Sequence, residues 1–400
     1  MRGSLILSLA ALMAAVSVSA AMGQPGPAPA LPLTGPPASP PATLATASGP
    51  APSLAVAPAP VEAPTRYPFA TPAKRIHRPL LVAFSVPWDV NAVADLQRHL
   101  GSLDVYAPQI IALSSGAVVS VTEEPAVAAI LAARRGRPAV MPLVVNAHDH
   151  VWDPEAAAQA LLDPALRASL LTRLADLARE RGYGGYIFDF EGLTPQAAAA
   201  YPAFMSAARA ALGGHGREVW ATATLGPDAL PTARLANAAD ALVLMGYDEC
   251  WITSNPGPVA GPDWLAALLA QRVHGVDPSR LIVALGAYAY DWPDRQPARV
   301  LSLEEAGKLA AVYQTTPEVD PASRNRRFSY VDPAGVHHSV WMAAGEAFAS
   351  NRVAALALHP RGLAMWRLGL DDEGVWAASL AKPGRAAPVA LRAPHPCDPL

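Results

Sequence analysis

Between residues 74 and 380 the sequence alternates between two kinds of segment, and this alternation constrains the fold more than any other feature. Short runs rich in β-branched and apolar residues, such as Leu80 to Val86, are followed by alanine- and leucine-rich runs with helical spacing, such as Asn91 to Leu100. Strands that alternate with helices favour a parallel sheet, because each crossover helix returns the chain to the same end of the sheet. We predict strands at residues 80–86, 105–113, 139–145, 186–190, 218–224, 241–246, 280–287 and 363–368.

Eight strands in a unit of about 300 residues predict an α/β protein of the (β/α)8 TIM-barrel type. The seventh connection is too long for one helix, because it contains a helical stretch at 302–314 and a hairpin pattern at 328–341. We therefore expect a small hairpin insertion between strands 7 and 8. A doubly wound sheet is the alternative, although no glycine-rich phosphate-binding turn follows the first strand.

The N-terminal residues 1–24 have the pattern of a secretory signal peptide. Arg2 precedes an apolar run from Leu5 to Val18, and small residues follow at Ser19 and Ala20. We expect a periplasmic or secreted protein; an uncleaved membrane anchor is the alternative, since the apolar stretch is only slightly shorter than a membrane span.

Two further segments have a composition that does not support a folded core. Residues 25–73 are dominated by proline and alanine, which predicts a disordered linker, and residues 381–400 predict a flexible tail. The folded domain is then 74–380. A net charge of -3 and the lack of a basic run exclude a typical nucleic-acid-binding surface. The two cysteines, Cys250 and Cys397, are most economically two free or buried thiols, although an exported chain permits a disulfide.

The fourth predicted strand ends in two acidic residues, Asp189 and Glu191. Residues two apart on a strand point to the same face, so both carboxyl groups are expected on one side and Phe188 and Phe190 on the other. Buried acids are costly unless they pair, accept hydrogen bonds or take part in catalysis. The alternative is structural, with one acid capping the next helix and the other in solvent.

Barrel active sites form at the carboxyl ends of the strands, and the residues expected there suit a sugar ligand. Aromatic rings stack on the apolar face of a sugar, while carboxylates bind its hydroxyl groups. His148, Asp149 and His150 also follow the third strand, where a hydrogen-bonding loop is favoured over a metal site. The other residues at these ends are Trp88, Asp89, Asn146, Met245, Tyr247, Asp248, Tyr288, Tyr290, Trp366 and Arg367.

With these motifs in place, the sequence resembles the family 18 glycoside hydrolases, the chitinase-like barrels. Residues 184–191, G-G-Y-I-F-D-F-E, are similar to the family pattern D-G-x-D-x-D-x-E, and residues 245–248 match M-x-Y-D. Residues 281–288 and 364–366 resemble its seventh and eighth strands. Three further segments, near 84, 140 and 365, resemble the family 18-like domains of bacterial surface-polysaccharide proteins.

The resemblance implies substrate-assisted, retaining hydrolysis of a β-linked N-acetylhexosamine polymer without a metal or other cofactor. Glu191 would act as general acid and base, Asp189 would orient the substrate acetamide, and Tyr247 would donate a hydrogen bond to it. Asp248 would bind sugar hydroxyls and Trp366 would stack under the ring. Further substrate contacts are expected at Met245, Trp88, Asp89, Asn146 and Tyr288; for Trp88 and Asp89 a packed pair at the barrel rim is equally open.

The sequence also departs from the family pattern. Gly184 and Ile187 stand where the pattern has acids, and Ile187 is expected to face inward below Asp189. A catalytically impaired carbohydrate-binding barrel is therefore the main alternative, and a metal-dependent deacetylase using the 148–150 loop is a third. We expect a monomer with a polysaccharide or oligosaccharide substrate, acting in surface-polysaccharide or cell-wall remodelling in association with envelope polysaccharide enzymes.

Overall fold

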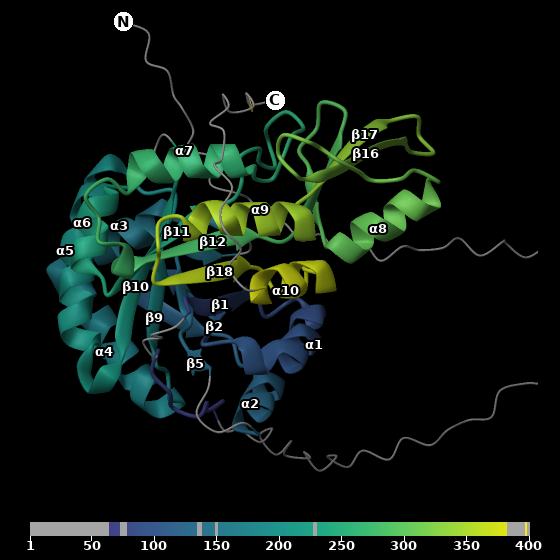
Figure 1. The fold of residues 1–400 in the computed structure, drawn as a ribbon. Helices are drawn as coiled ribbons and strands as arrows, with labels where there is room; N and C mark the ends of the chain where they lie inside the picture. Colours follow the sequence, from purple (N-terminus) through teal and green to yellow (C-terminus); the bar gives the residue numbers. More distant parts are fainter. Residues whose placement is uncertain are drawn as a thin grey trace, which may run out of the picture. The chain divides into compact units, whose positions relative to one another are not determined.

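A computed structural model describes residues 64–72, 78–133, 138–148, 151–226, 230–381 and 397. The predicted signal peptide and most of the predicted linker lie outside these residues. Within them, eight strand positions form a closed parallel barrel (Figure 1). The third position is split in two: one half pairs with the second strand and the other half with the fourth, which closes the ring. The barrel strands are β1 (Leu80–Ser85), β2 (Val105–Pro108), β5 (Ala139–Val140) with β6 (Leu143–Val145), β9 (Gly185–Asp189), β10 (Glu218–Thr224), β11 (Ala241–Gly246), β12 (Leu281–Gly286) and β18 (Gly362–Trp366).

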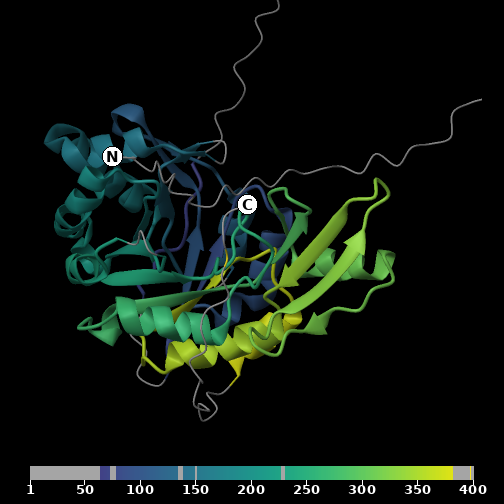
Figure 2. The same cartoon turned by 90° about the horizontal axis from the view of Figure 1, so that it is seen from above.

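Helices surround this barrel in both views (Figures 1 and 2), as the alternating sequence predicts. Several begin at an acid whose side chain accepts hydrogen bonds from the first free backbone N–H groups, for example Asp153 and Asp163. No helix in the described part of the chain is long and apolar enough to cross a membrane. The helices are α1 (Val90–His99), α2 (Pro125–Ala132), α3 (Pro154–Leu162), α4 (Pro164–Arg181), α5 (Pro195–Leu212), α6 (Thr232–Ala238), α7 (Pro262–Arg272), α8 (Leu303–Val312), α9 (Gly345–Leu356) and α10 (Glu373–Leu380).

The two faces of the barrel strands pack in separate apolar cores. Ile187 is fully buried in the core inside the barrel, together with Trp220 of β10. Phe188 and Phe190 point outward and pack against Phe204 of α5, with ring centroids 5.1 and 5.8 Å apart. The period-two prediction for the fourth strand is therefore confirmed, and Ile187 faces inward as expected.

The entry of β9 is crowded by backbone, which explains its two glycines. A Cβ atom on Gly185 would lie 2.0 Å from the Glu218 carbonyl oxygen, and one on Gly184 would lie 2.2 Å from that of Ala70. The segment 64–72 packs here, and Tyr67 N donates to Arg181 O at 2.7 Å. The linker predicted to extend to residue 73 therefore ends earlier, because residues 64–72 lie along the barrel.

The insertion between the seventh and eighth barrel strands is larger than the predicted hairpin. The hairpin is present, but it forms two strands of a five-stranded antiparallel sheet in the described chain (Figure 2). On one face of this sheet Tyr330 stacks on Tyr313 at the end of α8, with centroids 4.2 Å apart. The opposite face carries Tyr290, Trp292 and Trp341, which belong to the same core as the barrel interior. The strands are β13 (Ala289–Pro293), β14 (Arg299–Leu301), β15 (Glu318–Val319), β16 (Arg326–Val331) and β17 (His337–Met342).

Shorter elements complete the described chain. The second barrel strand continues as β3, which pairs with β6 and with the antiparallel β4. A small hairpin of β7 and β8 follows the third barrel strand. These elements are β3 (Ile111–Ser114), β4 (Val118–Val121), β7 (Ala147–His148) and β8 (Val151–Trp152), with short 3-10 turns at Leu100–Ser102, Ser115–Ala117, Gly214–Gly216 and Pro278–Arg280.

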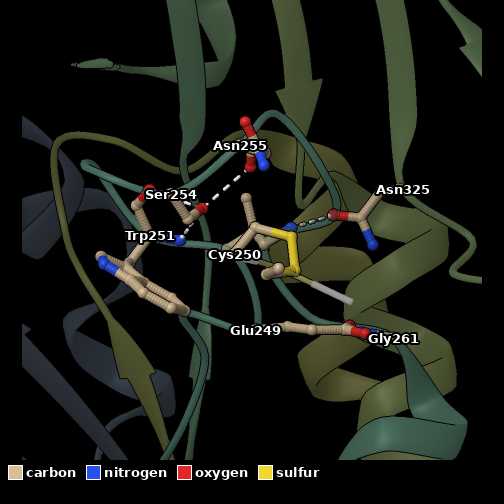
Figure 3. The surroundings of a disulfide bond; sticks show 9 residues. Glu249, Cys250, Trp251, Ser254, Asn255, Gly261 and Asn325 are labelled. Carbon is tan, nitrogen blue, oxygen red and sulfur yellow. Dashed lines mark hydrogen bonds between the residues drawn. A yellow bond between two sulfur atoms is a disulfide. The ribbon is translucent and has the colours of Figure 1, made fainter. Parts of the chain in front are cut away.

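Cys250 and Cys397 form a disulfide, with Cα atoms 5.2 Å apart (Figure 3). The expectation of two free or buried thiols is therefore wrong. Cys250 is fully buried and its N–H donates to Pro258 O at 3.0 Å, so the bond is anchored in an ordered loop. The predicted flexible tail lies outside the described residues apart from Ala381 and Cys397, and Cys397 is tied covalently to the domain.

Candidate active site

Glu191 follows the carboxyl end of β9 and is held there by Asn146, which directly follows β6. The Asn146 side chain is fully buried, its Oδ1 accepts from Glu191 N at 2.9 Å, and its Nδ2 donates to Glu191 O at 2.9 Å. Nδ2 also donates to Asp153 O at 2.9 Å. Asn146 therefore fixes the main chain of Glu191; the substrate contact expected of it stays a prediction.

Asp189 lies two residues before Glu191 and accepts a hydrogen bond from Thr222 of β10. Thr222 Oγ1 donates to Asp189 Oδ1 at 2.6 Å, and both side chains are buried. Burial raises the pKa of Asp189 to about 6, and the Thr222 hydrogen bond opposes that rise. The sequence did not single out Thr222. Its position alone could have indicated it: Thr222 is two residues after the inward-facing Trp220 on β10, which places it beside Asp189 on β9.

Glu191 has the properties of a general acid. Burial raises its pKa well above the usual range, and the negative charges of Asp189 and Asp248 raise it further. A raised pKa favours the protonated form of the carboxyl group, which an acid catalyst requires. Two carboxyl groups whose pKa values are separated in this way can take different roles in one reaction.

Tyr247 and Trp366 form an aromatic pair at the ends of β11 and β18. Their ring centroids are 6.1 Å apart with an interplanar angle of 18°. Phe84 of β1 packs against Trp366 at 5.5 Å. Burial and the neighbouring acids raise the pKa of Tyr247 well above its usual range, so its hydroxyl remains a hydrogen-bond donor. The arrangement suits an apolar sugar face with a polar group within reach of Tyr247.

Asp248 accepts hydrogen bonds from two tyrosines at the same oxygen. Tyr288 and Tyr290 both donate from their hydroxyl groups to Oδ1, the latter at 2.9 Å. Burial raises the pKa of Asp248 to about 6, and these two hydrogen bonds oppose the rise. The two hydrogen bonds fix the orientation of the Asp248 carboxylate, and its negative charge raises the pKa of Glu191.

The remaining predicted contacts occupy the same end of the barrel with different surroundings. The Trp88 side chain is 42% exposed. Asp89 begins α1 by accepting from Asn91 N at 3.0 Å, and it forms an ion pair with Arg367. Met245 is half-buried within β11. Asp89 thus has a structural role at the rim, and the substrate contacts expected of these three residues stay predictions.

The histidine loop after the third strand is described only in part. His148 Nε2 lies 2.8 Å from Leu113 O, which is a structural hydrogen bond. Asp149 and His150 lie outside the described residues, so the metal alternative for this loop is not tested. Among the described residues no group of three or more histidine, cysteine, aspartate or glutamate side chains is arranged to hold a metal ion.

No family model matches the chain. Its sequence is nevertheless similar to curated proteins from Bacillus. It is 25% identical over 249 residues to the uncharacterized glycosylase YvbX of Bacillus subtilis, covering 59% of this chain and 72% of that protein. It is 24% identical to the cortical fragment-lytic enzyme of Bacillus subtilis, covering 59% of this chain and 58% of that enzyme. The chain thus spans little more than half the length of the second relative.

Solved structures share the fold. A chitinase from Chromobacterium violaceum superimposes with a TM-score of 0.69 at 22% identity, covering 76% of this chain and 98% of that one. The Bacillus cereus spore cortex-lytic enzyme SleL gives 0.67 at 19% identity, covering 76% and 74%. The fold is therefore that of the chitinase-like (β/α)8 barrels. The resemblance is confirmed at the level of the fold, and the names of the similar proteins support a glycoside hydrolase of the chitinase-like type.

Proposed function

We propose that the protein hydrolyses a β-linked, N-acetylhexosamine-containing glycan by substrate-assisted, retaining catalysis. One observation carries the proposal: Glu191 has a raised pKa at the carboxyl end of the barrel, with Asp189 and Asp248 as charged neighbours. Family 18 enzymes lack a protein nucleophile, so a single acid with supporting groups is sufficient.

The proposed reaction begins when the Glu191 carboxyl gives its proton to the glycosidic oxygen. The substrate acetamide oxygen then attacks the anomeric carbon, the bond to the leaving sugar breaks, and a cyclic oxazolinium ion forms. The Asp189 carboxylate accepts a hydrogen bond from the acetamide nitrogen and stabilises the positive charge, while Tyr247 donates to the acetamide oxygen. Water then attacks the anomeric carbon, the bond from that carbon to the acetamide oxygen breaks, and the Glu191 carboxylate takes the proton of the water. The acetamide and the protonated Glu191 are restored, and the product keeps the β configuration.

Ile187 changes the surroundings that set the pKa of Asp189. Ile187 fills the barrel interior below Asp189 with apolar surface, so no second acid supplies a proton from that side. Thr222 instead supplies a hydrogen bond from the neighbouring strand. This contact favours the ionised form of Asp189, which the stabilisation of a cationic intermediate requires.

The substrate class we favour is a cell-wall or surface polysaccharide. Two of the similar proteins are named for lysis of the spore cortex or its fragments, which supports a glycan of the cell envelope as the substrate. Export through the predicted signal peptide fits such a substrate. In this proposal the protein acts as a monomer, in association with other enzymes that build or modify envelope polysaccharides.

The alternative is a carbohydrate-binding barrel with impaired catalysis. It is favoured by Ile187 and by the Tyr247–Trp366 aromatic pair, which would bind a sugar whether or not hydrolysis followed.

Hydrolysis of a glycan panel separates the two. The panel contains N-acetylglucosamine oligomers, partly deacetylated polymers and peptidoglycan. The native protein is compared with Glu191→Gln and with Glu180→Gln, a matched change of an exposed glutamate on α4. Cleavage by the native protein and by Glu180→Gln, with loss in Glu191→Gln, supports the enzyme. Equal binding by all three without cleavage supports the binding barrel.

A further inference from the structure

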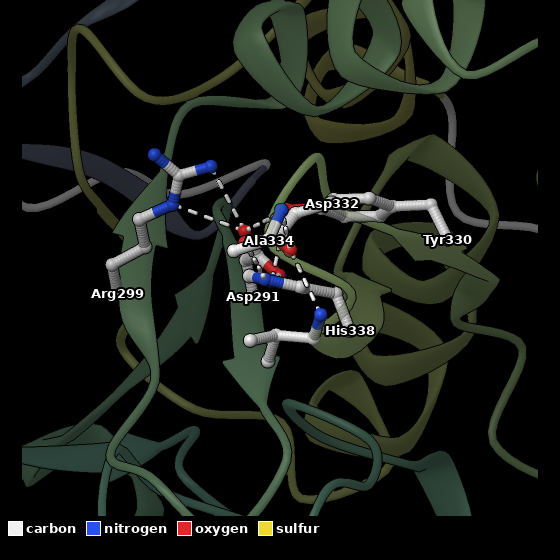
Figure 4. A network of polar contacts seen from close by, with 7 residues as sticks. Asp291, Arg299, Tyr330, Asp332, Ala334 and His338 are labelled. Carbon is white, nitrogen blue, oxygen red and sulfur yellow. Dashed lines mark hydrogen bonds and ion pairs between the residues drawn. The ribbon is translucent and has the colours of Figure 1, made fainter.

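Asp291 of β13 is the centre of a polar network within the insertion sheet (Figure 4). Its side chain is fully buried, and its Oδ2 accepts from Arg299 Nε at 3.0 Å, Arg299 Nη2 at 2.9 Å and the Tyr330 hydroxyl at 2.8 Å. His338 Nδ1 lies 2.8 Å from Oδ1. These partners belong to β14, β16 and β17, so one carboxylate ties three other strands to β13.

His338 lies in β17 of the hairpin and is nearly buried. A histidine in a hairpin is expected to be exposed, but the His338 side chain is only 10% exposed. Its ring stacks on Tyr330 with centroids 4.4 Å apart, and Nδ1 is shared between Tyr330 and Asp291. The network therefore has a closed geometry that fixes the strand at Asp291.

Tyr290, the residue before Asp291, points to the opposite face of the sheet. Its hydroxyl donates to Asp248 Oδ1 at 2.9 Å, beside the hydrogen bond from Tyr288 to the same atom. Its ring is fully buried. It packs edge-on against Tyr288, with ring centroids 5.2 Å apart, and at a tilt against Trp292, with centroids 5.0 Å apart. β13 is thus held by Asp291 on one face and reaches the active site with Tyr290 on the other.

We propose that Tyr290 is a positioning residue for Asp248, and that the Asp291 network holds Tyr290 in place. The inference rests on the proposed function, in which Asp248 binds sugar hydroxyls. Two donors to Oδ1, one from the segment after β12 and one from β13, restrict the rotation of the carboxylate more than a single donor would. Within the described residues Asp248 Oδ2 makes no hydrogen bond, so the oxygen presented to the substrate is the one that the tyrosines leave unused.

The insertion thereby becomes part of the active-site machinery. Tyr288 follows barrel strand β12, whereas Tyr290 belongs to the insertion sheet. The barrel and the insertion therefore each supply one hydrogen bond that orients Asp248. Burial and the Asp248 charge raise the pKa of Tyr290 well above its usual range, which keeps its hydroxyl a donor.

The test replaces the Tyr290 hydroxyl while keeping its ring. In Tyr290→Phe, the titration of Asp248 is followed by NMR of carboxyl-13C-labelled aspartate, with Asp248→Asn used to assign the signal. We expect the pKa of Asp248 to rise by roughly 0.5–1 unit, because a hydrogen bond to the ionised form is lost. We also expect KM for a cleaved oligosaccharide to rise about three- to tenfold, with a smaller change in kcat.

Tyr313→Phe is the matched control, because this tyrosine stacks on Tyr330 at the far side of the insertion. It should leave the Asp248 titration and KM unchanged. Asp291→Asn, measured below its unfolding transition, should move the Asp248 titration in the same direction as Tyr290→Phe.

An Asp248 titration in Tyr290→Phe that matches the native protein would overturn the inference, whatever happens to hydrolysis. Failure of the native protein to cleave any glycan would instead overturn the proposed function, and the NMR measurement would still decide the role of Tyr290.

Discussion

The hydrogen bond from Thr222 to Asp189 offers a quantitative test of the electrostatics. In Thr222→Val the side-chain volume is nearly kept while the hydroxyl that donates at 2.6 Å is removed. A buried hydrogen bond to a charged group contributes about 1.5–3 kcal/mol, and one pKa unit corresponds to about 1.4 kcal/mol. The pKa of Asp189, about 6 in the native protein, should therefore rise by roughly 1–2 units.

The consequence for catalysis depends on pH in a specific way. The acidic limb of the kcat/KM profile, which reports the free enzyme, should move up by the same roughly 1–2 units, because the ionised form of Asp189 is the active one. Activity should fall about 5- to 50-fold at pH 6 and recover towards the native level at alkaline pH. The alkaline limb should not move, because Glu191 loses its proton only after Asp189 is already ionised.

The assay is a profile of kcat/KM against pH on an oligosaccharide that the native protein cleaves, with Thr222→Ser as the matched variant. Serine keeps the hydroxyl and should restore the native acidic limb. A loss of activity that is equal at every pH, or an acidic limb that stays in place in Thr222→Val, would refute the reasoning.

Three further predictions follow from other parts of the chain. Asn146→Ala should lower kcat about 10- to 100-fold with little change in KM, because Glu191 loses the amide that fixes its backbone; steady-state kinetics on a cleaved oligosaccharide measures this. Asp371→Asn should stabilise the protein by about 1–2 kcal/mol at pH 8 and by little at pH 4, measured by urea unfolding. Burial and the Asp95 charge raise the pKa of Asp371 in the folded state to about 8. The folding stability of the native protein therefore falls as the pH rises from the pKa of Asp371 in the unfolded state, about 4, towards 8. Replacing Cys250 and Cys397 by alanine should lower the free energy of unfolding by about 2–5 kcal/mol, and added reductant should then have no further effect on thermal unfolding.

Strand positions and the direction of the strand-four side chains could be predicted because they depend on local periodicity. Ile187, Phe188 and Asp189 alternate with period two, and the neighbouring glycines indicate close backbone packing. The candidate acids were found for the same reason, because the end of a buried strand is a constrained position.

Other features were missed because they depend on contacts between distant segments. The disulfide joins residues 147 positions apart, and sequence spacing does not specify such a pair. β13 follows barrel strand β12 almost directly, without the glycine- and proline-rich turn that marks a new strand. Residues 64–72 have a proline-rich composition, but they pack because the glycines at 182 and 184 leave room for their backbone.

The most direct test of the central claim is the anomeric form of the first product, observed by proton NMR during cleavage of an N-acetylglucosamine oligomer. The account predicts that the β anomer appears first, that Glu191→Gln abolishes the signal, and that removing the acetyl group on the non-reducing side of the cleaved bond prevents cleavage. An initial α anomer, or equal cleavage of the deacetylated substrate, would contradict substrate-assisted catalysis at Glu191.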